Sequence, residues 1–279
     1  MQLPINFEFS QSSLQDYTDC RRRFFLRYIQ RVAWPAVQTE PIQENERHIL
    51  RGERFHRLVQ QYLLGVPVQR LVEIANADED EHLPHWWQTF LSWATTGLSG
   101  ARSVELTLLA PLAGYRLTAR YDMILLNPEG SLVIYDWKTS LNRPRRSWLA
   151  SRLQTRVYPY LLAHTGGLLL KNTAVVTPDQ ISMIYWFAAF PDQAECFNYS
   201  DAQFTEDSRI LESLVTEILS LPETGFELTS HIEHCAFCVY RSLCDRGISA
   251  GSFSDNEAEP EGPSIDFNLD LDQTGEISF

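Results

Sequence analysis

Residues 131–139 read SLVIYDWKT, an apolar run that ends in an acid and a lysine two positions apart. Val, Ile and Tyr favour β-structure, so the pattern predicts a buried strand. Because strand side chains alternate between the two faces of a sheet, Asp136 and Lys138 share one face and Trp137 points to the other. The strand therefore directs a carboxylate and an amine into one volume, for which a simple ion pair is the default interpretation.

Two further strands are expected immediately before this one. Residues 103–112, SVELTLLAPL, and 115–126, YRLTARYDMILL, show strand-like periodicity, with turn signals at 113–114 and 127–130. Three consecutive strands with short connections predict a meander. Asp122 lies in an apolar part of the middle strand, where an unpaired charge is costly to bury, so we expect it to have a partner or a bound cation.

Helical periodicity flanks the meander on both sides. Helices are expected at 9–29, 48–64, 84–94, 147–163 and 203–219, and a fourth strand at 180–190. The chain order of helix, three strands, helix and strand predicts an α/β fold. His56 lies on a helix among apolar neighbours, where a packed core histidine is the default interpretation. Gln154 and Tyr158 lie four positions apart, on one face of the helix that follows the meander.

Three of the five cysteines lie close together near the end of the sequence. Cys235, Cys238 and Cys244 form a C-x2-C-x5-C pattern, which in a reducing compartment is more typical of metal ligands or redox groups than of disulfides. A closed thiolate site needs four ligands, so the pattern leaves one unassigned. Cys196 has no partner in the pattern and is interpreted as a buried small apolar residue.

The net charge of −13 is unevenly distributed along the chain. Residues 251–279 contain eight acids and no Lys or Arg, which leaves −5 for the rest, and this tail has the composition of a disordered segment. Residues 137–178 contain seven bases and no acid, and a second basic block, CRRRFFLRYIQR, spans 20–31. The default interpretation of either block is a solvated helix face, but the interleaved aromatic residues make a nucleic-acid groove a competing one.

The sequence shows neither the pattern of a secretory leader nor that of a membrane span. The first residues lack a basic region followed by an apolar one, and the apolar run IYWFAAF at 184–190 is far shorter than a bilayer span. We therefore expect a cytoplasmic protein with no membrane partner. The sequence also lacks the G-x4-G-K-[ST] pattern of a nucleotide-driven motor, so a helicase would have to be a separate protein.

One ordered set of residues runs through the chain: His56, Asp122, Asp136-x-Lys138, Gln154-x3-Tyr158 and the cysteine triplet. This set resembles the PD-(D/E)XK nuclease superfamily, and within it the RecB-like branch, which includes CRISPR-associated RecB-like exonucleases and the AddB nuclease domain. The resemblance covers nearly the whole chain to about residue 247. It implies a restriction-endonuclease-like core, a central mixed sheet flanked by helices in αβββαβ order. We accordingly expect a nuclease domain at 1–250 and an acidic tail at 251–279.

The resemblance also implies roles for these side chains. The catalytic residues would be Asp122, Asp136, Lys138, Gln154 and Tyr158, and the metal ligands would be His56, Asp122 and Asp136. One or two Mg2+ or Mn2+ ions would polarise the scissile phosphate and activate a water, which Lys138 would position. An imidazole ligand favours Mn2+. Gln154 and Tyr158 would face the nucleic acid, and Asp136 stands where many relatives have the longer Glu.

A fourth thiol also follows from the resemblance. In the iron–sulfur members of the family, one cysteine near the N-terminus and three near the C-terminus hold a 4Fe-4S cluster, and Cys20 fits the first of these positions. The cluster would join the two ends of the nuclease domain, closing a long loop and removing chain entropy from the unfolded state. Tetrahedral zinc would also suit four thiolates, and the spacing alone leaves both metals open.

Together these inferences lead to an expected function. The chain would be a divalent-metal-dependent deoxyribonuclease, an exonuclease acting on single-stranded or end-frayed DNA in repair, recombination or CRISPR adaptation. A helicase, an integrase or a single-strand binding protein would be its partner. The alternative is a non-catalytic DNA-binding or assembly subunit that keeps the fold, against which the retention of both acids and the lysine argues.

Overall fold

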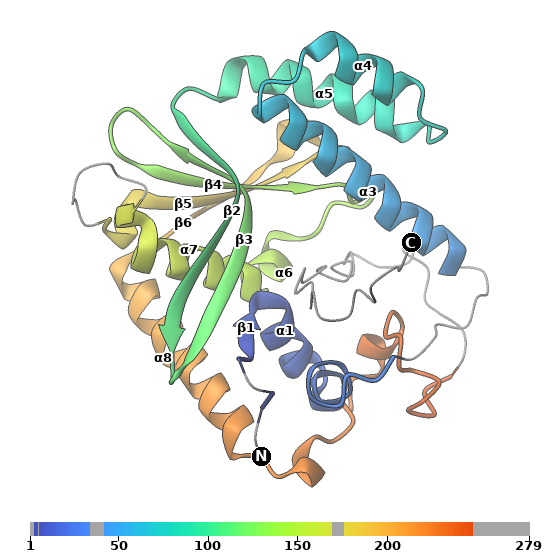
Figure 1. The fold of residues 1–279 in the computed structure, drawn as a ribbon, viewed down its shortest axis with the longest axis vertical. Coiled ribbons are helices and arrows are strands. Elements are labelled where there is room, and N and C mark those ends of the chain that lie inside the picture. The colour runs from blue at the N-terminus through green and yellow to red at the C-terminus, as the bar shows by residue number, and fades with distance from the viewer. Residues whose placement is uncertain (1–2, 5, 34–41, 169–175, 248–279) are drawn as a thin grey trace, which may run out of the picture.

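The computed structural model describes residues 3–4, 6–33, 42–168 and 176–247. The acidic tail expected at 251–279 lies outside these ranges, and so the expected domain boundary does too. Figure 1 shows the described chain as a sheet with helices packed against it. No helix in the described part of the chain is long and apolar enough to cross a membrane.

A six-stranded mixed sheet forms the centre of the molecule. Its strands are β1 (Glu8–Ser10), β2 (Ala101–Leu112), β3 (Tyr115–Leu126), β4 (Leu132–Lys138), β5 (Ile181–Phe187) and β6 (Glu195–Asn198). The order is β1, β3, β4, β5, β6, and β2 pairs with β3 along its whole length. β1 and β3 are parallel, as are β4 and β5, whereas the other pairs are antiparallel. The expected meander is therefore present as β2, β3 and β4.

Helices cover both faces of the sheet (Figure 1). They are α1 (Gln11–Asp19), α2 (Arg21–Phe24) followed by a π-helical turn at Phe25–Ile29, α3 (Ile42–Leu63), α4 (Val68–Asn76), α5 (His82–Gly97), α6 (Arg146–Ser151), α7 (Leu153–Thr165) and α8 (Asp201–Ser220). One core lies between the sheet and α1, α7 and α8, and a second, rich in aromatic side chains, lies between the sheet and α3, α4 and α5. This is a mixed α/β fold with a central mixed sheet flanked by helices, as the sequence predicts.

Strand β3 bends at Asp122. Residues two apart in a regular strand face the same side, yet Tyr121 lies in the core beside α7 whereas Met123 lies in the core beside α5. Glu105, which lies opposite Asp122 on β2, is skipped by the β2–β3 ladder and has a left-handed backbone with φ of 53°. The first half of β3 pairs with β1 and the second half with β4, and Asp122 lies between the two pairings.

Two of the expected helices are interrupted. The helix expected at 9–29 begins instead with strand β1 and breaks at Cys20, where an extended backbone separates α1 from α2. The helix expected at 147–163 breaks at Arg152, where an extended backbone separates α6 from α7. The helical pattern of the sequence continues through both positions, so contacts with distant segments, rather than local propensity, determine the breaks.

The segments near the two ends of the described chain lie side by side. The Arg22 N–H donates to the Glu227 carbonyl oxygen at 3.1 Å, and the Tyr240 hydroxyl donates to the Val32 carbonyl oxygen at 3.0 Å. Direct protein contacts thus hold the segment that carries Cys20 against the segment that carries the three C-terminal cysteines.

Candidate active site

The end of β4 carries the acid and the lysine in the arrangement that strand alternation predicts. Lys138 Nζ lies 2.9 Å from Asp136 Oδ2, so the two side chains share one face. Asp136 is buried, with 5% of its surface exposed, because β4 lies between β3 and β5 and is covered by helices on both sides. The pair therefore sits at a buried strand end rather than on the protein surface.

Gln154, the second residue of α7, contacts both members of this pair. Its Nε2 donates to Asp136 Oδ1 at 2.6 Å, and its Oε1 accepts from Lys138 Nζ at 3.1 Å. The first residue of α7 is held in turn by α1, because the Leu153 N–H donates to Gln15 Oε1 at 3.0 Å. The side-chain amide thus fixes the relative orientation of the carboxylate and the ammonium group.

Asp122 has the partner that its apolar setting on β3 led us to expect. Its Oδ2 accepts from the Trp137 N–H at 2.9 Å, and its Oδ1 lies 3.4 Å from His56 Nδ1. Burial alone would raise the pKa of Asp122, but the His56 ring and the Trp137 N–H outweigh it and lower the pKa below its usual range. Asp122 is therefore the group that links helix α3 to the end of β4.

His56 faces this carboxylate, so its interpretation as a packed core histidine is wrong. The helix that carries it is held by aromatic contacts, including the stacking of Phe55 on Trp186 at 6.2 Å. Burial would lower the pKa of His56, but the Asp122 carboxylate outweighs that effect and raises the pKa to about 9. A third of the side chain remains exposed, which leaves the imidazole within reach of other groups at the site.

Asp136 is more easily protonated than Asp122, because its pKa is raised whereas that of Asp122 is lowered. Burial raises the pKa of Asp136 to about 6 against the attraction of Lys138, and repulsion from Asp122 adds to the rise. Oδ2 of Asp136 is buried, and its contact within the described residues is the ion pair with Lys138. Two carboxylates and an imidazole are a suitable donor set for a divalent cation. As they stand, no three His, Cys, Asp or Glu side chains in the described chain converge as a metal-binding group.

Gln154 and Tyr158 are expected from the resemblance to face the nucleic acid, and that orientation stays a prediction. Both are buried, with 6% and 7% of their surfaces exposed, because this face of α7 packs on the sheet. The backbone oxygen of Tyr158 accepts from the Tyr121 hydroxyl at 2.8 Å, and the two rings lie 4.8 Å apart. Tyr158 therefore packs on β3 next to Asp122.

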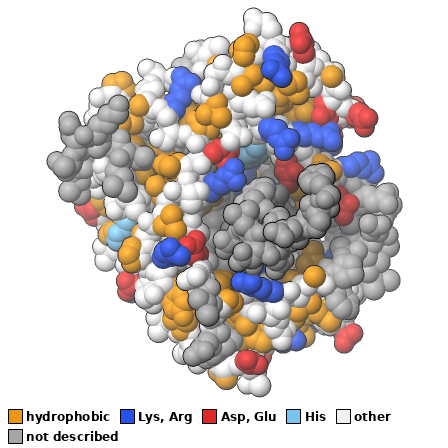
Figure 2. Space-filling view, in the orientation of Figure 1, with side chains coloured by type: hydrophobic (Ala, Val, Ile, Leu, Met, Phe, Trp, Pro, Cys, Tyr) orange, Lys and Arg blue, Asp and Glu red, His pale blue; other side chains and the backbone are white. Residues whose placement is uncertain are grey.

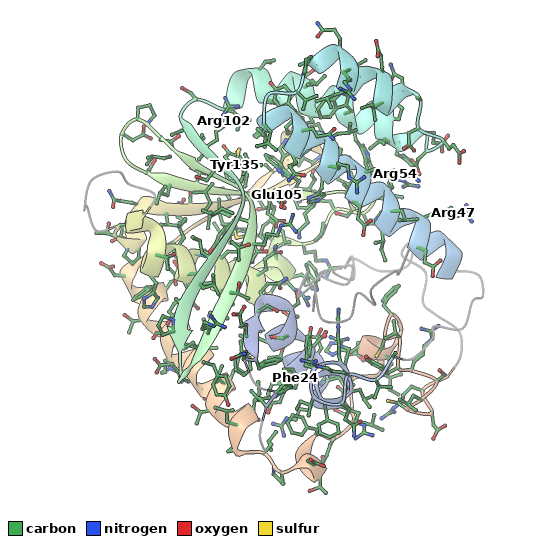
Figure 3. The ribbon with its side chains drawn as sticks, in the orientation of Figure 1. Phe24, Arg47, Arg54, Arg102, Glu105 and Tyr135 are labelled. Atoms are coloured by element: carbon green, nitrogen blue, oxygen red, sulfur yellow. The ribbon has the colours of Figure 1, made fainter. Side chains whose placement is uncertain are left out.

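Glu105 is a further acid near the site. It lies where the strands converge in Figure 3, and its Oε2 accepts from Arg120 Nε at 2.6 Å. Burial raises the pKa of Glu105, and the nearby Asp122 carboxylate raises it further. Its left-handed backbone is a conformation that costs a residue with a side chain about 1–2 kcal/mol, so the bend of the sheet at the site is strained.

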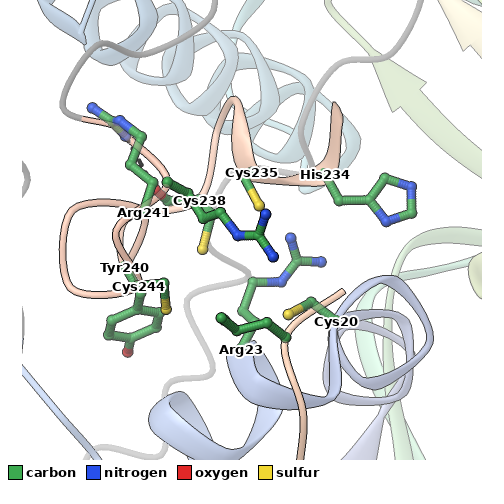
Figure 4. A pocket seen from close by; sticks show the side chains of 10 residues that line it. Cys20, Arg23, His234, Cys235, Cys238, Tyr240, Arg241 and Cys244 are labelled. Carbon is green, nitrogen blue, oxygen red and sulfur yellow. Dashed lines mark hydrogen bonds between the residues drawn. The ribbon is translucent and has the colours of Figure 1, made fainter. Parts of the chain in front are cut away.

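The four cysteines expected to bind a cluster line one pocket, between α2 and the C-terminal segment (Figure 4). Cys20, Cys235, Cys238 and Cys244 are free thiols, and Arg23 lines the same pocket. Burial raises the pKa of Cys238 to about 11 and, with the proximity of Cys20, raises the pKa of Cys235 and of Cys244. Four thiols around one pocket are a suitable donor set for an iron–sulfur cluster or zinc.

Cys196 is exposed, so its interpretation as a buried apolar residue is wrong. It lies on β6, the last strand in the sheet order, whose residues alternate between half-buried and exposed. The thiol of Cys196 lies 3.7 Å from Asn198 Oδ1 and takes no part in the cysteine pocket.

Six arginines of the two basic blocks form ion pairs with acids that lie outside the blocks. Arg143 and Arg146 pair with Glu195, Arg156 with Asp207, Arg23 and Arg27 with Asp16, and Arg21 with Glu217. Figure 2 shows both Lys or Arg and Asp or Glu side chains on one face of the molecule. These arginines support the interpretation of paired helix faces over that of a continuous basic groove.

Two residues at the site were not predicted from the sequence. Gly52, one helical turn before His56, lies against Thr139 at the end of β4, and a glycine inside a helical pattern is a signal that could have identified it. Gln15, which holds the start of α7, has no such signal, because its contact with Leu153 joins segments far apart in the sequence.

The chain was compared with known proteins. No curated protein matches it. Several solved structures are similar, including the two that follow. One, of a candidate exonuclease from Eubacterium rectale, is 12% identical with a TM-score of 0.48 over 82% of this chain and 89% of that one. The other, of SSO0001, is 14% identical with a TM-score of 0.39 over 88% of each chain. A family model, that of the PD-(D/E)XK nuclease superfamily, matches residues 8–245, which include the strands, the acids, the lysine and all four pocket cysteines. The chain therefore belongs to the PD-(D/E)XK nuclease superfamily.

Proposed function

We propose that this protein is a divalent-metal-dependent deoxyribonuclease that degrades single-stranded or end-frayed DNA as an exonuclease. The observation that carries the proposal is the buried group at the end of β4. There Lys138 and Asp136 share one face, Gln154 contacts both, and Asp122 lies between the strand and His56. In a member of a nuclease superfamily, this group has the donors and the cation that phosphodiester hydrolysis requires.

The proposed metal ligands are His56, Asp122 and Asp136. A bound Mg2+ or Mn2+ ion would polarise the phosphate and supply a water of lowered pKa. The buried carboxylate of Asp136 has a raised pKa, so a nearby cation would stabilise its charged form. The imidazole among the ligands favours Mn2+ over Mg2+.

The remaining proposed catalytic residues act through position and charge. Lys138 would hold the attacking water and stabilise negative charge on the phosphate, for which the amide oxygen of Gln154 keeps its ammonium group oriented. Gln154 also restrains the carboxylate of Asp136. Tyr158 would support the site by packing on β3, where its backbone oxygen accepts a hydrogen bond from the Tyr121 hydroxyl.

The test is cleavage of 5′- and 3′-labelled single-stranded and double-stranded DNA with Mn2+ or Mg2+. The wild type is compared with Lys138→Ala and with Arg209→Ala, which removes an exposed cation of α8 far along the chain from the site. We expect metal-dependent cleavage by the wild type and by Arg209→Ala, a loss in Lys138→Ala, and a product ladder that reports the polarity. An inert wild type that still binds DNA would replace this proposal with the non-catalytic DNA-binding or assembly subunit.

We further propose that Cys20, Cys235, Cys238 and Cys244 hold a 4Fe-4S cluster, as in the RecB-like branch of the family. The pocket that the four thiols share supports this assignment, and zinc is the alternative occupant. A cluster there would link the two segments that already contact each other and would stabilise the fold by closing the loop between them.

Iron, sulfide and zinc analysis of anaerobically purified protein tests the cluster. We expect iron and labile sulfide in the wild type and their loss in Cys20→Ser. Cys196→Ser is the matched control, because Cys196 is exposed on β6 and lies outside the pocket, and it should retain the metal. Zinc without iron would replace the cluster with a structural zinc site, and no metal at all would contradict both.

The proposed domain organisation is a nuclease domain at 1–250 followed by an acidic tail at 251–279. The pathway we propose is DNA repair, recombination or CRISPR adaptation, in a reducing cytoplasm that keeps the thiols available to a metal. A separate helicase, integrase or single-strand binding protein would deliver or protect the DNA strand.

A further inference from the structure

Gly52 marks an unusually close approach between α3 and the end of β4. It is buried in the interior of α3, where glycine is a poor helix former compared with alanine. A Cβ atom placed on Gly52 would lie 2.9 Å from Thr139 Oγ1, closer than real Cβ contacts. The backbone of α3 therefore lies nearer to β4 than any residue with a side chain would allow.

Thr139, the residue that faces Gly52, has little conformational freedom. Thr139 directly follows Lys138, the last residue of β4, and is buried with 7% of its surface exposed. It is β-branched, so few rotamers are open to it and its hydroxyl cannot swing freely away. A side chain at position 52 would have to be accommodated by a shift of a few tenths of an ångström between the helix and the strand end.

That shift would act on the proposed metal-binding group. Gly52 and His56 lie one turn apart, so they share the face of α3 that is turned to the sheet. His56 Nδ1 lies 3.4 Å from Asp122 Oδ1, at the outer limit of a hydrogen bond, and Asp122 accepts from the N–H of Trp137, two residues before Thr139. The helix thus approaches the end of β4 directly through Gly52, and it is connected to that end through His56 by way of Asp122 on β3.

We propose that Gly52 and Thr139 are positioning residues, whose contact sets the separation of α3 from β4 and with it the placement of His56 on Asp122. The proposal rests on the proposed function, because the placement of His56 matters to cleavage only if the imidazole belongs to the metal-binding group. Neither residue touches the reacting atoms, and each acts through the spacing of the two elements.

The test uses one single variant, which adds a side chain at position 52, and two double variants. The double variants differ in whether the atom that faces the new side chain is removed. Gly52→Ala should lower kcat about 10- to 100-fold, because a small misplacement of a catalytic group has effects of this size, although alanine is the better helix former. Gly52→Ala with Thr139→Ala should recover most of the lost kcat, because the atom that the new Cβ meets is gone. Gly52→Ala with Thr139→Val should not recover it, because valine keeps a carbon where Oγ1 lay.

Circular dichroism and thermal melting of each variant separate misplacement from misfolding. If Gly52→Ala alone does not fold, the contrast between the two double variants carries the same test. Equal cleavage by the wild type and a folded Gly52→Ala would overturn the positioning role and leave the nuclease standing. Recovery in neither double variant, or in both, would overturn the role of the Thr139 contact. A wild type that cleaves no DNA with either metal would overturn the proposed function, and the positioning role with it.

Discussion

His56 is a residue whose charge contributes to stability over a defined range of pH. Its pKa of about 9 in the folded protein lies above its ordinary value of 6.5, so the charged ring is stabilised by the fold. This contribution is fully present below pH 6.5 and is lost as the pH rises through 9. In metal-free protein, the free energy of unfolding should therefore fall more over this range in the wild type than in His56→Gln.

Urea denaturation of the two proteins at both ends of this pH range measures the difference. Other titrating groups are common to both proteins, so the comparison isolates the imidazole. Parallel pH dependences of the two unfolding free energies would contradict the contact between His56 and Asp122.

Gln154 permits a sharper test of the Asp136 carboxylate. Gln154→Glu keeps the size of the side chain but replaces the Nε2 donor to Asp136 with a second acid, which should raise the pKa of Asp136 above its value of about 6. In metal-free protein, an NMR pH titration should therefore show the Asp136 carboxyl losing its proton at higher pH in Gln154→Glu than in the wild type. Gln154→Ala serves as the uncharged control. The same titration midpoint in Gln154→Glu and the wild type would contradict the contact between Gln154 and Asp136.

For individual residues, the sequence predicts the features that follow from the alternation of side chains along a strand. The common face of Asp136 and Lys138 follows from their spacing alone, and so does the need of Asp122 for a partner. The identity of that partner does not follow, because His56 reaches Asp122 from a helix on another part of the chain. The exposure of Cys196 also could not be predicted from the local sequence pattern, because it depends on β6 being the last strand of the sheet order.

Among the elements, the hairpin of β2 and β3 leads to a testable prediction, because Glu105 within it has a left-handed backbone. If Glu105 lay in a regular strand, Glu105→Val would be more stable than Glu105→Gly, because valine favours strands and glycine weakens them. Because its backbone is left-handed, we expect the reverse order, with the Val variant less stable by about 1–2 kcal/mol. Both substitutions remove the ion pair with Arg120, so the loss of that pair cancels in the comparison. Chemical denaturation measures it, and a more stable Val variant would contradict the bend.

The periodicity of the sequence predicts the long elements and misses the short ones. The strands of the meander and the helix at 201–220 match their expected ranges closely, because each repeats its apolar period several times. β1 is only three residues long and carries no period. The helix at 68–76 has apolar residues at helical spacing, a signal from which it can be predicted. The break at Arg152 depends on the side chain of Gln15, which no local pattern contains.

For the whole molecule, the distribution of charge along the sequence differs from its distribution in space. Several bases of blocks that contain no acid pair with acids from other elements, as Arg156 does with Asp207 of α8. The sequence could not predict these pairs because their members are distant along the chain. Residues 251–279, which contain eight acids and no Lys or Arg, lie outside the described residues.

Removal of the tail tests its effect on DNA binding. Truncation after residue 250 removes eight negative charges and changes the net charge from −13 to −5. We expect tighter DNA binding at about 50 mM salt and a smaller gain at about 200 mM, because screening weakens the repulsion between the tail and the phosphates. Fluorescence anisotropy with labelled single-stranded DNA measures both affinities. Equal affinities of the two proteins at low salt would contradict an electrostatic role for the tail.

The central claim is that the acid at the end of β4 serves catalysis, and Asp136→Asn tests it most directly. The amide has the size of the carboxylate and can keep a hydrogen bond with Gln154, but it removes the charge that a metal ion requires. Cleavage and binding of the same labelled single-stranded DNA are measured for wild type and variant with Mn2+. We predict that the variant binds the DNA as the wild type does and cleaves it at least about 100-fold more slowly. Cleavage at the wild-type rate by Asp136→Asn would contradict the proposed active site.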